Sequence, residues 1–453
     1  MNNKPSQMTF SRRIDIRQEV DVFVAGGGPA GTTAAIAAAR QGASVFIAEG
    51  QMAFGGMGTS GGLPMLCCFS DEINFLSAGV GREIHDRLTR GGGAIAHALC
   101  KQSDLYIQPE ALKLVYDELL TAEPRITCSL DTRVIGVEVA DGTVNHVICQ
   151  GKSGIFAIRC GAVVDATGDG DICAWAGAPF AKGDERGRMQ PGTMVSMWAG
   201  IDWPAAEAAG CGLWKQSHRL AQAIADGVFT SPDPGMPGIV PTGRTIGNGN
   251  VGHLFGLDGT DERSMTAAAM LARRQMREYG RYFREYLRGY EGIELCGSAA
   301  RVGVRETRRI TGDYALTIDD FLTKAVFDDE IGRYCYPVDV HASTIEEAVT
   351  PTNDHFERLR LRPGESYGIP FRILLPRGLR NVLTAGRCVS ADRLVLGSLR
   401  VMPGCYITGQ AAGVGAALAA GGTDVHSLPV RAVQRRLRDL GCHLPNLPAE
   451  TVA

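Results

Sequence analysis

Three glycines near the start of the chain have a spacing that could hold a phosphate-bearing ligand. Gly26, Gly28 and Gly31 form the pattern G-x-G-x-x-G in the loop 26–31. In this pattern the first glycine permits a tight turn, the second lets the backbone approach a pyrophosphate, and the third allows a helix to pack closely on a sheet. The alternative is a glycine-rich turn without a ligand, because the pattern alone is weak.

An acidic residue further along the chain favours the ligand. Glu49 lies just after the next apolar run. A carboxylate at this position accepts hydrogen bonds from the hydroxyl groups of an adenosine ribose and disfavours a 2′-phosphate. The loop and the acid together predict a dinucleotide whose adenosine ribose is not phosphorylated.

Two histidines in the second half of the chain could move a proton during a reaction. His341, which ends the segment 336–341, is the first candidate, and His253 is the second. Imidazole is suited to this role because its unperturbed pKa lies near neutral pH. A solvated or structural histidine is the alternative at both positions.

A group of arginines could hold an anionic substrate. Arg305, with Glu306 beside it, and Arg400 could each bind a carboxylate through two parallel hydrogen bonds. Arg305 belongs to a basic segment with Arg301, Arg308 and Arg309. If this segment is a strand, alternation of its side chains places Arg308 on one face and the other three arginines on the opposite face. An ion-paired or solvated basic strand is the alternative.

The elements around the glycine loop have the order of a strand–helix–strand unit. Residues 20–25 are β-branched, aromatic and apolar, which predicts a buried strand. Small residues from Pro29 to Gln41 predict a helix, and residues 43–48 predict the next strand. This context turns a weak glycine pattern into a dinucleotide-binding fingerprint.

Three later segments also bring backbone close to a ligand. A second glycine cluster spans 55–62, a small-residue turn spans 165–171, and residues 381–388 lead to a helix from Pro403 to about Ala420. A helix that begins with proline presents free N–H groups to whatever lies before it. A plain surface loop is the alternative for residues 55–62. We therefore expect a long cofactor that both ends of the chain contact.

The remaining pattern predicts an α/β fold with an insertion. Residues 107–120 form an amphipathic helical pattern, and residues 133–139 and 144–148 read as a hairpin through Asp141-Gly142. The middle third has no second glycine fingerprint, which argues against a reductase with its own NAD(P)H domain. We expect a Rossmann-like, three-layer ββα nucleotide-binding domain at 19–193 and 374–440, an inserted α+β substrate domain at 194–373, and an N-terminal extension at 1–18.

Composition and charge exclude several functional classes. The 453 residues carry a formal net charge of −3, so no overall field favours nucleic acid. No apolar run approaches the about 18 residues of a membrane span, and the first residues show no secretory signal, so a cytoplasmic location is expected. The 13 cysteines include no C-x-x-C pair. This spacing argues against metal ribbons, iron–sulfur clusters and redox dithiols.

The ordered set of segments resembles the FAD-dependent oxidoreductases that are related to the fumarate reductase flavoproteins, within the glutathione-reductase-like superfamily. The segments that carry this resemblance are 21–31, Glu49, 55–62, 163–171, 303–314 and 383–413. The resemblance implies FAD as the cofactor. The residues that it places at the cofactor are Gly26, Gly28, Pro29, Ala30, Gly31, Glu49, Gly50, Gly56, Met57, Thr59, Val134, Ala166, Thr167, Gly168, Gly386, Arg387, Val401 and Met402.

The resemblance also implies individual roles along the cofactor. Val134 would pair with adenine through its backbone, and Gly386 and Arg387 would lie along the ribityl chain, where the wider superfamily usually has an acid in place of the arginine. The N–H groups near Val401 and Met402 would face flavin O2 and N1, where negative charge gathers on reduction.

The function implied is hydride transfer between flavin N5 and a small polar or anionic organic substrate. His341, Arg305, Arg400 and His253 are the candidate catalytic residues. The alternatives are a flavin-dependent monooxygenase or halogenase, a tRNA-modifying flavoprotein, and a flavin-binding partner without catalysis. The expected partners are a small-molecule substrate, an electron acceptor of undetermined kind, and further copies of the chain in a homo-oligomer, with neither nucleic acid nor a membrane span.

Overall fold

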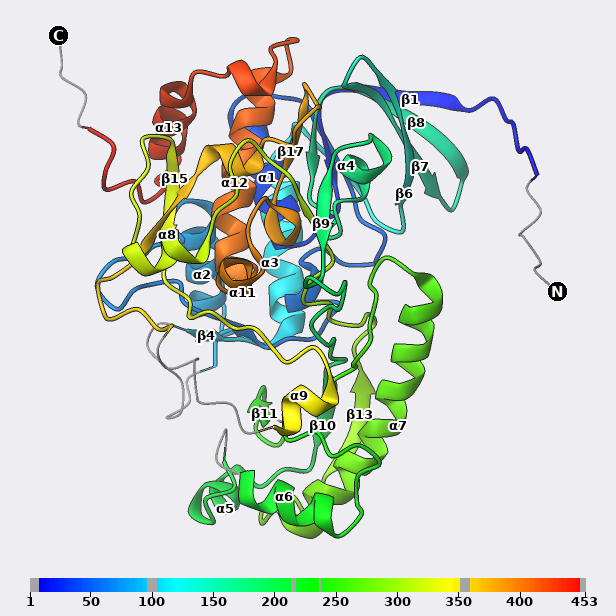
Figure 1. Ribbon diagram of the computed structural model, residues 1–453, viewed down its shortest axis with the longest axis vertical. Coiled ribbons are helices and arrows are strands. Elements are labelled where there is room, and N and C mark those ends of the chain that lie inside the picture. The colour runs from blue at the N-terminus through cyan, green and yellow to red at the C-terminus, as the bar shows by residue number, and fades with distance from the viewer. Residues whose placement is uncertain (1–7, 96–103, 213–216, 236–237, 351–358, 449–453) are drawn as a thin grey trace.

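The computed structural model describes residues 8–95, 104–212, 217–235, 238–350 and 359–448. Figure 1 shows two parts: an upper part to which both the N-terminal and the C-terminal segments contribute, and a lower part made from the middle of the chain. Within the described ranges, no helix is both long and apolar enough to cross a lipid bilayer.

The upper part is built on a seven-stranded sheet in the order β5-β2-β1-β8-β7-β6, with β17 also paired to β8. β8 pairs with β1 along one edge, and along the other edge its first half pairs with β7 and its last residues, Val163 to Asp165, pair with β17. The strands are β1 (Asp15–Ala25), β2 (Val45–Ala48), β5 (Ile126–Ser129), β6 (Arg133–Ala140), β7 (Thr143–Gly151), β8 (Gly154–Asp165) and β17 (Val382–Thr384).

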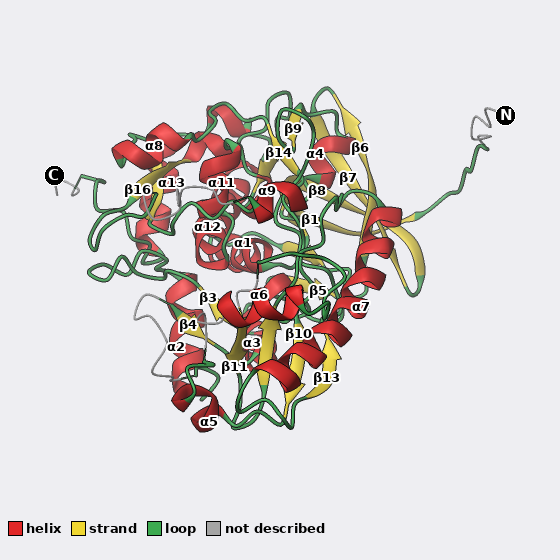
Figure 2. Ribbon diagram, turned by 60° about the horizontal axis from the view of Figure 1, so that its bottom comes forward, coloured by secondary structure: helices red, strands yellow, loops and turns green. Residues whose placement is uncertain are grey.

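The five strands β5, β2, β1, β8 and β17 are parallel, whereas β6, β7 and β8 form an antiparallel meander. Helices cover one side of the parallel strands and the meander extends from the other, which is the expected α/β, Rossmann-like arrangement (Figures 1 and 2). The turn between β6 and β7 has Asp141 at φ +49° and Gly142 at φ +75°, both in the left-handed region that a two-residue hairpin requires.

Two helices from opposite ends of the chain form the centre of the upper part. α1 (Pro29–Arg40) lies against α12 (Met402–Ala419), and almost every residue of both helices is buried. Their close approach depends on small residues: a Cβ atom at Gly409 would lie 2.2 Å from the carbonyl oxygen of Ala30, and one at Gly413 would lie 2.2 Å from that of Ala34.

The lower part has its own sheet and its own core. The antiparallel sheet order is β11-β12-β10-β13, and the long helix α7 (Glu262–Tyr286) packs on it with Trp198 against Phe283. Its buried apolar side chains run from Met194 to Val302. The strands are β10 (Ser196–Ala199), β11 (Gly238–Pro241), β12 (Gly247–Asn250) and β13 (Glu294–Ser298).

The buried side chains from Leu316 to Ile373 belong to the core around α1 and α12. The domain boundaries that the sequence indicates at 193/194 and 373/374 stay a prediction. The other elements used below are η1 (Gly56–Gly58), α3 (Pro109–Thr121), α4 (Asp171–Trp175), α6 (Ser217–Ala225), β9 (Phe180–Lys182), β14 (Arg308–Ile310), α8 (Ile318–Thr323), β15 (Glu330–Tyr334), β16 (Tyr367–Pro370) and α11 (Arg393–Leu399).

Two sequence-based expectations differ from the structure. The first strand begins at Asp15 rather than Val20, because Asp15 pairs with Phe156 at the start of β8. The expected single strand carrying the arginines is wrong: residues 301–307 cross between the two parts in an irregular path, and only Arg308–Ile310 form a strand, paired with β9.

Candidate functional site

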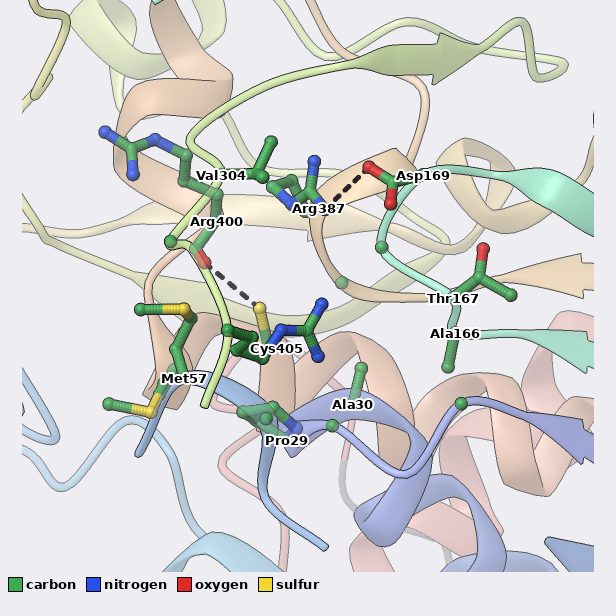
Figure 3. Close-up of a pocket in the computed structure, with 18 of the residues that line it drawn as sticks. Pro29, Ala30, Met57, Ala166, Thr167, Asp169, Val304, Arg387, Arg400 and Cys405 are labelled. Carbon is green, nitrogen blue, oxygen red and sulfur yellow. Dashed lines mark hydrogen bonds and ion pairs between the residues drawn. The ribbon is translucent and has the colours of Figure 1, made fainter. Parts of the chain in front are cut away.

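A cavity of about 680 Å³ lies where the two parts of the molecule meet. Its upper wall is made by the carboxyl ends of β1, β8 and β17 and by the start of α12, and Val195 and Asn250 line it from the lower sheet. Parallel sheets bind ligands outside the carboxyl ends of their strands, so the cavity lies where this fold holds a cofactor. Figure 3 shows this cavity with Pro29, Ala30, Ala166 and Thr167 facing it.

The glycine loop forms a cradle with open space at one position. A Cβ atom at Gly28 would meet no atom within 4 Å, so this backbone is open to a ligand. Gly26 has φ +92°, and a Cβ there would lie 2.6 Å from the carbonyl oxygen of Ala166. At Gly31 a Cβ would lie 1.8 Å from the carbonyl oxygen of Gly26, which shows that this glycine permits helix packing.

Glu49 is fixed at the far end of the cavity. Its carboxylate accepts hydrogen bonds from the backbone N–H of Gly27 and of Gln51, each at 2.8 Å. The side chain is buried yet lines the cavity beside Arg133 and Val134. A positioned carboxylate next to an open loop fits the hydroxyl groups of a ribose.

Most residues expected at the cofactor line this cavity. Gly31 and Thr59 do not: Gly31 packs against the strand, and the Thr59 hydroxyl donates to the carbonyl oxygen of Phe54 at 2.6 Å. The residues that do line it are Gly26, Gly28, Pro29, Ala30, Glu49, Gly50, Gly56, Met57, Val134, Ala166, Thr167, Gly168, Gly386, Arg387, Val401 and Met402.

The start of α12 points at the cavity. Val401 is the N-cap residue, Pro403 follows in the first turn, and Val401 and Met402 both line the cavity. No side chain caps the free N–H groups of this 18-residue helix. The positive end of a helix favours negative charge, so this position suits the electron-rich pyrimidine edge of a flavin.

Arg387 closes the wall between the two chain ends. Its guanidinium donates to Asp169 at 2.8 Å (Figure 3). It also donates to the hydroxyl of Thr307 at 3.0 Å. The Thr307 hydroxyl in turn donates to the same carboxylate oxygen at 2.6 Å. The arginine therefore ties the turn after β8 to the segment before β14.

Two buried arginines occupy the other end of the cavity. Arg305 is 9% exposed and donates to the carbonyl oxygen of Pro191 at 2.6 Å and to the Thr193 hydroxyl at 3.0 Å. Within the described part of the chain, no carboxylate lies within 4 Å of its guanidinium. Burial and the charge of Arg400 lower the pKa of Arg305 to about 10.

Arg400 has an unsatisfied donor. Its Nη2 donates to the backbone oxygen of Asp339 at 2.9 Å and lies 3.5 Å from that residue's carboxylate. Its Nε is buried and has no hydrogen-bond partner among the described residues. A buried donor without a partner costs free energy, so a ligand oxygen is the expected partner.

Four side chains beside these arginines form a continuous chain of polar contacts, which consists of two hydrogen bonds and an ion-pair contact at Asp339. Asp233 contacts Nδ1 of His253 at 3.1 Å, Nε2 of His253 contacts Nδ1 of His341 at 2.9 Å, and Nε2 of His341 contacts Asp339 at 3.2 Å. Asp339 and His341 line the cavity, and His253 lies behind His341.

The environment sets the charge of Asp339 and His341, the two members of the chain that line the cavity. Burial would raise the pKa of Asp339, but the hydrogen bond from His341 and the charges of Arg400 and Arg305 hold this pKa well below its usual range. Burial and the charge of Arg305 lower the pKa of His341 to about 4. At neutral pH the inner pair is therefore a carboxylate and a neutral imidazole.

The arginine cluster expected from the sequence is divided. Arg301 and Arg305 line the cavity, whereas Arg309 donates to the carbonyl oxygen of Gly183 and Arg308 pairs with Asp171. The expected pairing of Arg305 with Glu306 is wrong, because the Glu306 carboxylate accepts from Arg393 at 3.0 Å and lies 3.8 Å from Arg309.

Two carboxylates that contact the candidate histidines, Asp339 and Asp233, were not identified from the sequence. Asp339 precedes His341 by two residues, so the acid–x–histidine spacing was available as a signal. Asp233 reaches His253 only because the loop before β11 folds over it, and no local pattern indicates this contact. Tyr336 lines the same end of the cavity.

Comparison with known proteins agrees with these features. A family model described as FAD dependent oxidoreductase matches residues 21–437. A curated relative, the 6-methylpretetramide 4-monooxygenase of Streptomyces rimosus, is 29% identical over 176 residues, which are 35% of this chain and 41% of the relative. The match thus spans about two-fifths of that relative's length.

Solved structures with a similar arrangement have little sequence in common with the chain. A p-nitrophenol 4-monooxygenase from Pseudomonas putida is 12% identical, with a TM-score of 0.43 and coverage of 93% of this chain and 85% of that one. A myxobacterial chondrochloren halogenase is also 12% identical, with a TM-score of 0.45 and coverage of 93% and 79%.

Proposed function

The chain belongs to the family of FAD-dependent oxidoreductases, and from this premise we propose that it catalyses a redox reaction on a small organic anion held by Arg305 and Arg400. The observation that carries the proposal is the pair of buried guanidinium groups at the end of the cavity. Arg305 has no carboxylate partner among the described residues, and Nε of Arg400 has no partner there.

The charge balance favours an anionic substrate. Two buried cations face the cavity with one ionised carboxylate, Asp339, between them. An uncompensated buried charge costs about 3–5 kcal/mol. A carboxylate or enolate placed against both arginines would remove that cost and would bind with a defined orientation, because guanidinium groups pair bidentately with such oxygens.

The residues at the other end fit FAD. The open backbone at Gly28 would take the pyrophosphate, Glu49 the adenosine ribose, and the start of α12 the flavin. When bound, FAD supplies two-electron chemistry to the substrate. The protein's own part is to orient the anion, to exclude water from the closed end, and to hold a proton acceptor at Asp339 and His341.

We place the protein, within its family, near the fumarate reductase flavoproteins of the glutathione-reductase-like superfamily. In this arrangement, residues 19–193 and 374–440 form the FAD-binding domain and residues 194–373 form the substrate domain. The support is the position of the cavity: Gly26, Glu49 and Gly386 line it from the first domain, and Thr193, Val195 and Asn250 line it at or beyond the boundary.

The type of reaction has two candidates. Hydride transfer between flavin N5 and the substrate is favoured by the carboxylate and imidazole that face the cavity. Oxygen transfer is favoured by the curated relative, which is a monooxygenase. The comparison supports oxygen transfer better than it supports a dehydrogenase, and the arginine pair would hold an anionic substrate in either reaction.

Anaerobic mixing of the FAD-loaded protein with a panel of small carboxylic acids and phenols tests the proposal. We expect at least one anion to bleach the flavin absorbance, or to accelerate its reoxidation after chemical reduction. Product analysis under ¹⁸O₂ then separates the two reaction types, since only oxygen transfer labels the product. Neutral amides of the active acid serve as controls. If amides and acids react equally, the arginine pair does not hold the substrate.

A further inference from the structure

The hydrogen-bonded chain through the two histidines crosses from one part of the molecule to the other. Asp233 and His253 belong to the lower part, and His341 and Asp339 belong to the segment after β15. Both ring nitrogens of each imidazole are engaged. The backbone of both histidines is held as well, because His253 donates its backbone N–H to Asp233 and His341 donates its own to Gln190.

The contacts of the chain suit it to carry a proton. Asp233, His253, His341 and Asp339 make three successive contacts. Each imidazole can accept a proton on one ring nitrogen while it donates the proton on the other nitrogen. The chain can therefore pass a proton across both rings without a change in the number of protons that it holds.

The two histidines lie in different surroundings. The positive charge of Arg305 acts on His341, whereas His253 contacts the Asp233 carboxylate. The charged and titratable groups around the pair are Asp233, Asp339, Arg305, Arg400, Tyr336 and Tyr279.

Asp233, the end of this series of contacts that is remote from the cavity, lies close to solvent. Asp233 is 6% exposed, but its neighbours Pro232 and Pro234 are both exposed. Gly235 covers the contact between Asp233 and His253, and a Cβ atom there would lie 2.3 Å from Cε1 of His253. Only a thin layer of loop therefore separates Asp233 from water.

We propose that His341, His253 and Asp233 form a proton relay that connects the cavity, at Asp339, with solvent at the outer face of the lower part. Its use in turnover rests on the proposed function. Nε2 of His341 accepts a proton from Asp339, Nδ1 of His341 donates its proton to Nε2 of His253, and Nδ1 of His253 donates its proton to Asp233. One proton enters the chain and one leaves it, and no electrons move along it. Asp233 is a positioning residue, because it touches neither substrate nor cofactor.

Nitrogen-15 NMR of the FAD-loaded protein with labelled histidine tests the relay without a substrate. We expect one proton to be shared between Nε2 of His253 and Nδ1 of His341 and to couple to both nitrogens. In Asp233→Asn, exchange of this proton with solvent should slow about tenfold, since loss of a contacting carboxylate changes proton affinity by about that factor or more. Asp233→Glu should restore the exchange, and Asp226→Asn, on the exposed end of α6, should not change it.

Turnover provides the second measurement. Asp233→Asn should lower kcat about tenfold with little change in KM, and small bases such as formate should partly restore it. A wild-type spectrum with no proton shared between the histidines, or equal exchange in wild type and Asp233→Asn, would overturn the relay. If no anion reacts with the flavin, the proposed function fails, while the NMR result still decides whether the relay exists.

Discussion

The two ends of the cavity are lined in different ways. At one end, the lining comes from backbone groups and small residues, with Gly28 open to the cavity and Glu49 held by two backbone N–H groups. At the other end, the lining comes from charged side chains, among them Arg305, Arg400 and Asp339. In the proposed function the first is the nucleotide end, where affinity for the cofactor would depend on space, and the second is the substrate end, where action on the substrate would depend on charge. Substitutions at one end should therefore leave the other end intact.

The largest effect is expected at the nucleotide end, from Gly31→Ala. The new Cβ would lie 1.8 Å from a backbone oxygen that cannot move aside. Overpacking costs about 1–3 kcal/mol and sometimes more, and this contact with backbone should reach the upper end of that range. We expect loss of bound FAD and a lower midpoint of thermal unfolding.

Gly28→Ala is the matched control for Gly31→Ala. Gly28 has φ −69° and open space around its Cβ position, so the variant should fold like wild type. Its methyl group should nevertheless occupy the ligand's space and weaken FAD binding in a fluorescence titration. Normal FAD binding by Gly28→Ala would show that the pyrophosphate lies elsewhere.

The next largest effect is expected at the substrate end, from Arg400→Gln. Truncation of a buried charged partner costs about 2–5 kcal/mol of binding free energy, so kcat/KM for the anion should fall at least about thirtyfold. FAD content should stay unchanged. Arg380→Gln, an exposed arginine paired with Asp424, is the control. A parallel loss of FAD in Arg400→Gln would contradict the separation of the two ends.

A smaller effect concerns stability against pH. The pKa of His341 is lowered to about 4 in the folded protein, below its ordinary value of about 6.5. Between these values the unfolded chain binds the extra proton, so stability is fully present above pH about 6.5 and is lost as the pH falls toward about 4. Urea unfolding from pH 7 to pH 4 should show this slope. The slope should be flatter in His341→Asn, and equal slopes would contradict the neutral, buried state.

The smallest effect is expected where the two ends join, from Arg387→Lys. Lysine can keep the ion pair with Asp169 but cannot also reach Thr307 in the same geometry. Loss of one such hydrogen bond costs about 1 kcal/mol. We expect a decrease of a few degrees in the unfolding midpoint and a several-fold weaker FAD affinity. Effects as large as those of Gly31→Ala would mean that Arg387 itself binds the cofactor tightly.

The glycine loop and its flanking strand and helix could be predicted from the sequence because their determinants are local. The spacing of Gly26, Gly28 and Gly31, with a strand before them and a helix after, fixes a short stretch of chain whose geometry needs no distant contact. The helix from Pro403 could be found for the same reason, and it begins within a residue of the expected position.

The substrate end could be predicted only in part. His341, His253, Arg305 and Arg400 could be chosen as types of residue, but their meeting depends on how the two parts pack. The prediction of a single strand carrying the arginines was wrong because the connection between β13 and β14 is irregular. Asp233 has no local signal, since only the fold of its loop brings it to His253.

The contact between α1 and α12 has a consequence for biosynthesis. α1 is synthesised long before Gly409 and Gly413, the residues of α12 against which it packs. Until then the apolar side of the first helix has no native partner, and contacts between distant parts of a sequence form slowly. The nascent chain should therefore depend on chaperones, and free FAD should capture it only after the ribosome has released residue 419.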